Sequence, residues 1–100
     1  MIEVQDNPDQ GRFEIHVDGE LAGYARYLRR AGRIILVHTE IDGAFEGQGL
    51  GSKLAAGVLD DVRSRNLKVV PLCPFMAKYI ERHPDFADLV DEAALAALDD

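Results

Sequence analysis

The segment most able to do chemistry runs from residue 45 to residue 53 and reads Phe-Glu-Gly-Gln-Gly-Leu-Gly-Ser-Lys. Its glycines follow an apolar run and precede a helical pattern. Glycine permits positive φ and a close approach of the backbone to a ligand, and a helix N-terminus adds unpaired N–H groups and partial positive charge. These features predict a cradle for phosphate or pyrophosphate. The cradle would consist of Gly47, Gln48, Gly49, Leu50, Gly51 and Ser52.

The spacing of the glycines excludes two familiar nucleotide motifs. A Walker loop needs a glycine directly before Lys53, where this chain has Ser52. The dinucleotide pattern Gly-x-Gly-x-x-Gly, counted from Gly47, also needs a glycine at position 52. A flexible turn that starts a helix is the alternative interpretation of the segment.

One cysteine and one histidine are the candidate catalytic side chains. Cys73 ends an apolar run just before Pro74, which is a suitable first residue for a helix. A thiolate at a helix N-terminus is stabilised, so Cys73 is a candidate acyl-accepting nucleophile, with a small buried apolar role as the alternative. His38 is a candidate base for an incoming ammonium group, or else a structural histidine. Glu40 and Asp42 are either amine-binding carboxylates or solvated charges.

Composition limits the class of protein. The chain has 100 residues, which fit one domain over residues 1–100, with 47% hydrophobic and 29% charged residues. A net charge of −7 disfavours nucleic acid, and no apolar run is long enough to predict a membrane span. The N-terminus lacks the features of a signal peptide, so we expect a cytoplasmic protein. A single cysteine allows no internal disulfide, and the spacing of the histidines predicts no metal site.

Charge is unevenly distributed along the chain. Residues 24–38 contain four arginines and no acid, whereas residues 85–100 contain six acids and no lysine or arginine. Two solvated faces are one interpretation. The other is that the arginines help to hold an anionic ligand and that the acidic tail does not.

Apolar patterns predict a sheet that begins as an antiparallel meander. Asp18-Gly19 is a hairpin signal, and Ala31-Gly32 turns the chain again. The apolar run at 33–41 is continuous, which predicts burial on both faces of that strand. The expected strands are 1–5, 11–17, 20–29 and 33–41.

A helical crossover then leads to a parallel strand. Residues 52–65 carry one apolar helix face, and residues 67–73 read as a strand parallel to 33–41. Pro71 cannot donate a ladder hydrogen bond, so pairing should fail there. A second helix from Pro74 would end at His83-Pro84, and residues 86–98 look helical in one or two pieces. We therefore predict an α/β fold with a mixed sheet. The apolar face of the second helix would be Phe75, Met76, Tyr79 and Ile80.

In this order, the segments resemble a known family. Glu46-Gly47-Gln48-Gly49-Leu50-Gly51 resembles the acyl-CoA motif of the GNAT N-acetyltransferase superfamily, written Arg/Gln-x-x-Gly-x-Gly/Ala. Residues 38–40, 69–75 and 79–84 resemble blocks of the small, single-domain, YjdJ-type group, so that the resemblance covers about residues 3–90. Glu46 departs from the motif, and only backbone N–H groups are expected to hold a pyrophosphate there.

The resemblance implies a GNAT fold with acetyl-CoA as cosubstrate. In such folds the pyrophosphate of CoA rests on the glycine loop, and the pantetheine arm runs beside the central strand, here along Thr39, Glu40 and Ile41. Two parallel strands splay apart, and the thioester lies in the gap between them. Direct attack by an amine is the usual route, and Tyr79 is a candidate proton donor to the leaving thiolate, with core packing as its alternative role.

These observations together predict acetyl transfer to a primary amine of unknown identity. The chain lacks the additional N-terminal helices that often shape the acceptor pocket in larger members, so an open site would suit a protein or peptide amine. The alternative is a module that binds CoA or acyl-CoA without turnover and acts through a partner. Neither nucleic acid nor membrane is an expected partner.

Overall fold

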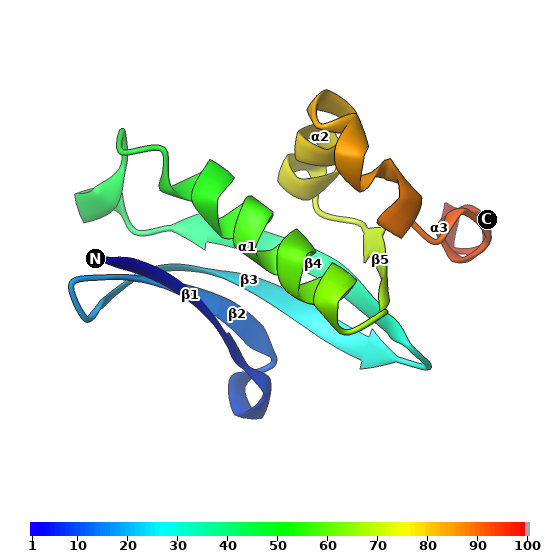
Figure 1. Cartoon of the computed structure of the whole chain (residues 1–100), viewed down its shortest axis with the longest axis horizontal. Helices are drawn as coiled ribbons and strands as arrows, with labels where there is room; N and C mark the ends of the chain where they lie inside the picture. Colours follow the sequence, from blue (N-terminus) through cyan, green and yellow to red (C-terminus); the bar gives the residue numbers. More distant parts are fainter. Residues whose placement is uncertain (100) are drawn as a thin grey trace.

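The computed structural model describes residues 1–99 as one five-stranded mixed sheet with α1 packed across one face (Figure 1). The strands lie in the order of the chain, with three antiparallel pairings followed by the parallel pairing of β4 with β5. The predicted α/β fold with an antiparallel meander and a parallel pair is confirmed. The strands are β1 (Ile2–Asn7), β2 (Arg12–Val17), β3 (Glu20–Arg30), β4 (Arg33–Ile41) and β5 (Lys68–Pro71).

Both predicted hairpin turns form in two residues. Asp18 and Gly19 have φ of 50° and 86°, and Ala31 and Gly32 have φ of 40° and 82°. Positive φ at both central positions is the type of turn whose twist matches that of the flanking strands. The turns therefore set the starting register of β2 with β3 and of β3 with β4.

Within residues 1–99, three α-helices and three short 3₁₀ helices complete the fold. α1 starts two residues before the predicted helix, because Gly49 adopts a left-handed conformation and ends the loop there. The predicted helical tail forms in two pieces, with a break at Val90 and Asp91. The helices are α1 (Leu50–Ser64), α2 (Pro74–Arg82), α3 (Glu92–Asp99), η1 (Pro8–Gln10), η2 (Gly43–Phe45) and η3 (Pro84–Leu89). None of the helices in residues 1–99 is both long and apolar enough to cross a bilayer.

The main core lies between α1 and the sheet. The apolar face predicted for α1 is fully buried and meets Phe13, Ile15, Ile34 and Leu36 from the strands. The prediction that β4 is buried on both faces is wrong. Ile35 and Val37 on its other face are only half-buried, because the short α3 covers just one end of that face. The buried face of α1 consists of Leu50, Leu54, Ala55, Val58, Leu59 and Val62.

The predicted apolar face of α2 is also only partly correct. Met76 and Ile80, four residues apart, are buried in the core. Phe75 is 42% exposed and Tyr79 is half-buried, because these two residues lie on the flank of the helix beside the start of α1. The strand before α2 is shorter than predicted, since β5 ends at Pro71.

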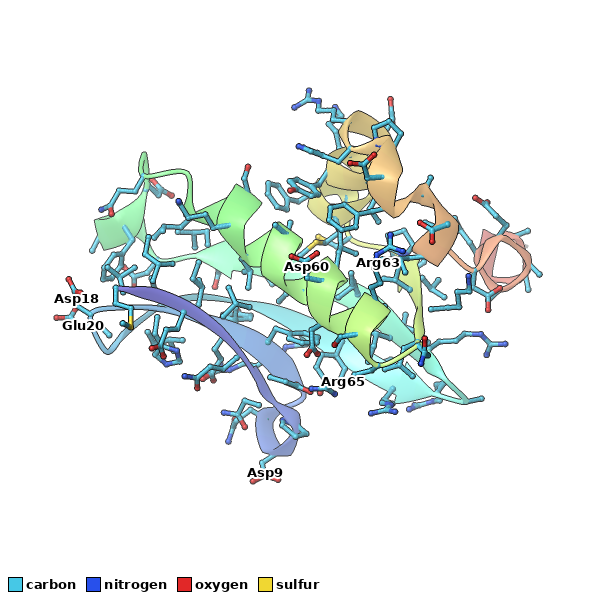
Figure 2. The ribbon with its side chains drawn as sticks, in the orientation of Figure 1. Asp9, Asp18, Glu20, Asp60, Arg63 and Arg65 are labelled. Atoms are coloured by element: carbon cyan, nitrogen blue, oxygen red, sulfur yellow. The ribbon has the colours of Figure 1, made fainter. Side chains whose placement is uncertain are left out.

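Ion pairs hold the acidic C-terminal segment in place. Figure 2 shows Arg63 and Arg65 at the end of α1 pointing to opposite sides. Arg63 pairs with Asp88 at 2.9 Å, and Arg65 pairs with Asp6 of β1 at 3.0 Å. Arg33 pairs with Asp91 at 2.8 Å. The segment is therefore not a purely solvated face, and hydrogen bonds from these arginines lower the pKa values of Asp88 and Asp91.

Gly23 of β3 allows a close approach that a larger residue would prevent. A Cβ at this position would lie 2.5 Å from the backbone oxygen of Glu40 and 2.6 Å from Cδ1 of Ile41. We expect Gly23→Ala to lower the free energy of unfolding by about 1–3 kcal/mol, because backbone atoms of β4 cannot move aside cheaply. Urea unfolding measures this change. Gly43→Ala is the matched control, because no atom lies within 4 Å of its Cβ position. Equal stability of the two variants would contradict the close packing of β3 on β4.

Candidate active site

The parallel pairing of β4 with β5 stops half-way along β4. It runs from Arg33 opposite Lys68 to Leu36 opposite Pro71. The oxygen of Leu36 then accepts from two successive N–H groups, those of Leu72 at 3.0 Å and Cys73 at 2.9 Å. The chain leaves the sheet at once and enters α2. Residues 38–41 stay paired with β3, but β5 no longer lies along the other edge of β4, and we call this unpaired edge beside the start of α2 the gap. The strand ends at Pro71 as predicted, but Pro71 itself still pairs with Leu36, and the pairing fails only after it.

A β-bulge in β4 reverses which side chains face α1. Tyr27 pairs with Leu36, but Arg26 pairs with His38, which leaves Val37 as the extra residue. A bulge shifts the alternation of side chains by one position. Leu36 and Thr39 therefore share the α1 face, and His38 lies on the opposite face.

Different polar side chains lie beside the gap on the two faces of the sheet. On the α1 face, Cys73 is 5% exposed, and its Sγ donates to Oγ1 of Thr39 at 3.4 Å. On the opposite face, the His38 side chain is 56% exposed, with Nε2 at 3.7 Å from Oε1 of Glu40. The structure thus places the two candidate catalytic residues beside the same gap but separates them by the sheet. They form no Cys–His pair.

A hollow of about 110 Å³ lies on the face opposite α1, beside the gap. Tyr24 and two carboxylates, Glu40 and Asp42, line it together with Gly23. The hydroxyl of Tyr24 donates to Oε2 of Glu40 at 3.0 Å, which raises the pKa of this tyrosine. Oδ1 of Asp42 accepts from the N–H of Ala44 at 2.9 Å and so caps η2. Sequence reasoning missed Tyr24, whose contact with Glu40 depends on the bulge.

The glycine segment forms a loop that ends at the N-terminus of α1. Gly47 and Gly49 have φ of 84° and 72°, which a side chain would disfavour. No side chain caps the helix, and its first intrahelical bond runs from the N–H of Lys53 to the oxygen of Gly49. The N–H groups of the first turn therefore remain available to a ligand. Gly51 plays a different part, because a Cβ there would lie 3.0 Å from Cζ of Phe75.

A second hollow, of about 140 Å³, lies between this helix start and α2. Lys78 and Arg82 bring two positive charges to it, next to the positive end of the α1 dipole. The remaining lining residues are Ser52, Phe75, Tyr79 and His83. Such a site suits an anionic group. Sequence reasoning missed Lys78 and Arg82, although the spacing of residues 75, 78, 79 and 82 places them on one side of a helix.

Tyr79 forms the wall of this second hollow. Its ring stacks on that of His83 with centroids 3.9 Å apart, and Nδ1 of His83 lies 2.8 Å from the backbone carbonyl oxygen of Tyr79. Burial raises the pKa of Tyr79, and the nearby charge of Asp60 on α1, labelled in Figure 2, adds to the effect. Its hydroxyl therefore keeps its proton at neutral pH.

The four arginines of residues 24–38 do not surround the glycine loop. They lie on β3 and β4, and the hairpin that carries Arg29 and Arg30 is at the opposite end of β4 from the loop (Figure 1). Arg33 is already paired with Asp91. These arginines therefore do not contribute to an anion site at the glycine loop, where Lys78 and Arg82 provide the positive charge. That they hold an anionic ligand elsewhere stays a prediction.

Comparison with known proteins agrees with this geometry. The sequence model of the GCN5-related N-acetyl-transferase family matches residues 12–89. The chain belongs to this family. Human Protein NATD1 is 37% identical over an alignment of 85 residues that covers 83% of this chain and 75% of the relative. Protein NATD1 of Gallus gallus is 28% identical over 85 residues, with 83% and 77% covered.

A solved structure shares the fold. The solution structure of a GCN5-like protein from Staphylococcus aureus superposes with a TM-score of 0.66 and covers 88% of this chain and 86% of its own, at 24% identity. The predicted resemblance to a small GNAT domain is thereby confirmed. Membership of the YjdJ-type group stays a prediction.

Tyrosine ionisation tests the geometry of the first hollow. The chain has three tyrosines, and all have raised pKa values, with Tyr27 raised to about 12, mainly by burial and then by its bond to Asp6. We expect Glu40→Gln to lower the pKa of Tyr24 towards 10, because the tyrosinate would no longer lie beside a carboxylate. Ultraviolet titration should show this shift, with Tyr27 as the internal control. An unchanged Tyr24 would contradict the hydrogen bond.

Proposed function

We propose that this protein transfers the acetyl group of acetyl-CoA to a primary amine. The observation that carries the proposal is the gap between β4 and α2, which adjoins an uncapped helix N-terminus and is bordered by polar groups on both faces. A thioester in this gap could be reached by an acceptor from the face of His38 and Glu40.

The glycine loop and α2 would hold the nucleotide part of the cosubstrate. Backbone N–H groups of residues 47–52 would bind the pyrophosphate, as expected of an uncapped helix start. Lys78 and Arg82 would add charge-assisted contacts to phosphate oxygens. The pantetheine arm would lie along the unpaired edge of β4, at Thr39, Glu40 and Ile41.

The reaction would proceed by direct attack. The acceptor amine loses a proton to His38, and its nitrogen bonds to the carbonyl carbon as the carbon–sulfur bond breaks. CoA leaves as a thiolate and takes up the second proton that the attacking nitrogen gives up, so the products are an amide and the CoA thiol. His38 lies on the open face, with its Nε2 3.7 Å from Oε1 of Glu40.

Cys73 fits this route as a contact of the thioester. Its thiol is buried and donates to Thr39, while His38 lies across the sheet. Among the described residues, its hydrogen-bond partner is Thr39 and not a base that could activate it as a nucleophile. An acyl-cysteine intermediate is not needed for the transfer.

The non-catalytic alternative draws on one observation. The His38 and Glu40 side chains are 56% and 59% exposed, so water would compete with an acceptor for both groups. A module that binds CoA or acyl-CoA for a partner protein would need only the loop, α2 and the edge of β4. Binding of CoA without acetylation of any amine would favour this function.

Calorimetry with CoA tests the cosubstrate site. We expect binding, and we expect the double variant Lys78→Ala/Arg82→Ala to weaken it about tenfold, since two phosphate contacts are lost. The double variant Arg29→Ala/Arg30→Ala removes the same charge at the far end of β3 and serves as the control. Absence of CoA binding to the unaltered protein would overturn both candidate functions.

Mass spectrometry tests the route of transfer. We expect no acetyl group on Cys73 after incubation with acetyl-CoA alone, but acetylated amines when a panel of primary amines is added. Cys73→Ser should keep measurable transfer, because the amine attacks the thioester directly. Acetylated Cys73 that decays when an amine is added would contradict direct attack.

A further inference from the structure

The face of the sheet opposite α1 carries an ordered pattern of charge along β3 and β4. Side chains alternate along a strand, so Tyr24, Arg26, Leu28 and Arg30 share this face. Tyr24 is half-buried and the other three are exposed. Each of these residues lies directly opposite a residue of β4, as the register of the two strands sets. The pairs are Tyr24 with Glu40, Arg26 with His38, Leu28 with Ile35, and Arg30 with Arg33.

This surface changes from acidic to basic along its length. Glu40 and Asp42 line the hollow at the end beside the gap. Arg26 is the next exposed residue of β3 after Tyr24, with its guanidinium 5.9 Å from the Tyr24 ring. Arg30, two positions beyond the 47% exposed Leu28, lines a hollow next to α3. Within residues 1–99, neither Arg26 nor Arg30 lies within ion-pair distance of a carboxylate.

We propose that the acceptor is a lysine within an acidic polypeptide that lies extended along this surface, an inference that rests on the proposed acetyl transfer. An extended peptide and a β-strand both advance about 6.8 Å in two residues, so the peptide matches the surface position by position. With the lysine amine at Glu40, acidic residues at the second and sixth positions meet Arg26 and Arg30. An apolar residue at the fourth position meets Leu28 and Ile35.

The charge pattern distinguishes this acceptor from other amines. A polyamine carries positive charge throughout, so its remote groups would lie against Arg26 and Arg30 and be repelled. The net charge of −7 does not oppose an acidic peptide at physiological salt, because charges beyond about 8 Å are largely screened. The local arginines then decide which sequence around the lysine is preferred.

Three synthetic peptides test the proposal. Each has a central lysine and leucine at the fourth position on both sides, which covers both chain directions. The second and sixth positions on both sides hold Glu, Gln or Arg. With the unaltered protein and acetyl-CoA at physiological salt, we expect kcat/KM for the Glu peptide to exceed that for the Gln peptide about fivefold, and the Arg peptide to be the poorest, as two exposed ion pairs allow.

Matched variants locate the effect on the surface. Arg26→Glu and Arg30→Glu should each reduce or reverse the preference for the Glu peptide. Arg29→Glu makes the same charge change on the same strand, but its side chain alternates to the other face, so the preference should remain. Calorimetry should show unchanged CoA binding in all three variants, which confirms that they are folded and able to bind the cosubstrate.

The outcomes separate this inference from the proposed function. Anisotropy of labelled peptides without acetyl-CoA reports docking alone, and preferential binding of the Glu peptide without acetylation would support the surface while contradicting transferase activity. Acetylation of all three peptides at equal rates would overturn the surface inference and leave the transferase activity standing. A single-stranded oligonucleotide that competes as well as the Glu peptide would also overturn it, because the arginines would then bind any polyanion.

Discussion

The two hydrogen bonds to the oxygen of Leu36 are the constraint on which the site depends. In a continued parallel ladder, β5 would keep pairing with β4 residue by residue. Here the N–H groups that β5 directs at β4 include those of Lys68 and Leu72, and the N–H of Cys73 then converges with that of Leu72 on one acceptor. That convergence turns the chain out of the sheet and starts α2. The unpaired edge of β4, the buried position of Cys73 and the approach of α2 to the glycine loop all follow.

The bulge at Val37 determines which side chains of β4 lie on each face of the sheet beside the gap. Without the extra residue, the side-chain alternation that buries Leu36 would also turn His38 towards α1. With it, Thr39 reaches Cys73, and His38 stays on the solvent face with Glu40. Under the proposed function, this one inserted residue would place the thioester contacts on one face and the acceptor contacts on the other. The two reactants would approach the gap from opposite sides of one sheet.

Local signals explain why much of this fold could be predicted. The tight turns, the apolar face of α1 and the break at Pro71 are short-range features, and each appears where the sequence indicated it. The bulge could not be predicted this way. A two-residue turn at Ala31-Gly32 would pair Tyr24 with Thr39, whereas the structure pairs it with Glu40. Phe75 and Tyr79 were assigned to the core for a related reason, because periodicity does not show which helix flank meets α1.

The contacts of β1 and of the C-terminal segment bear on where this domain can be cut. Both lie partly or wholly outside the family match over residues 12–89. Val4 packs on Gly57 with no room for a Cβ, and Val90 bridges to Val69 while the N–H of Asp91 bonds to the Val69 oxygen. A fragment trimmed to the match would lose an edge strand and bare the outer edge of β5, which is a template for aggregation. The folding unit is larger than the part that defines the family.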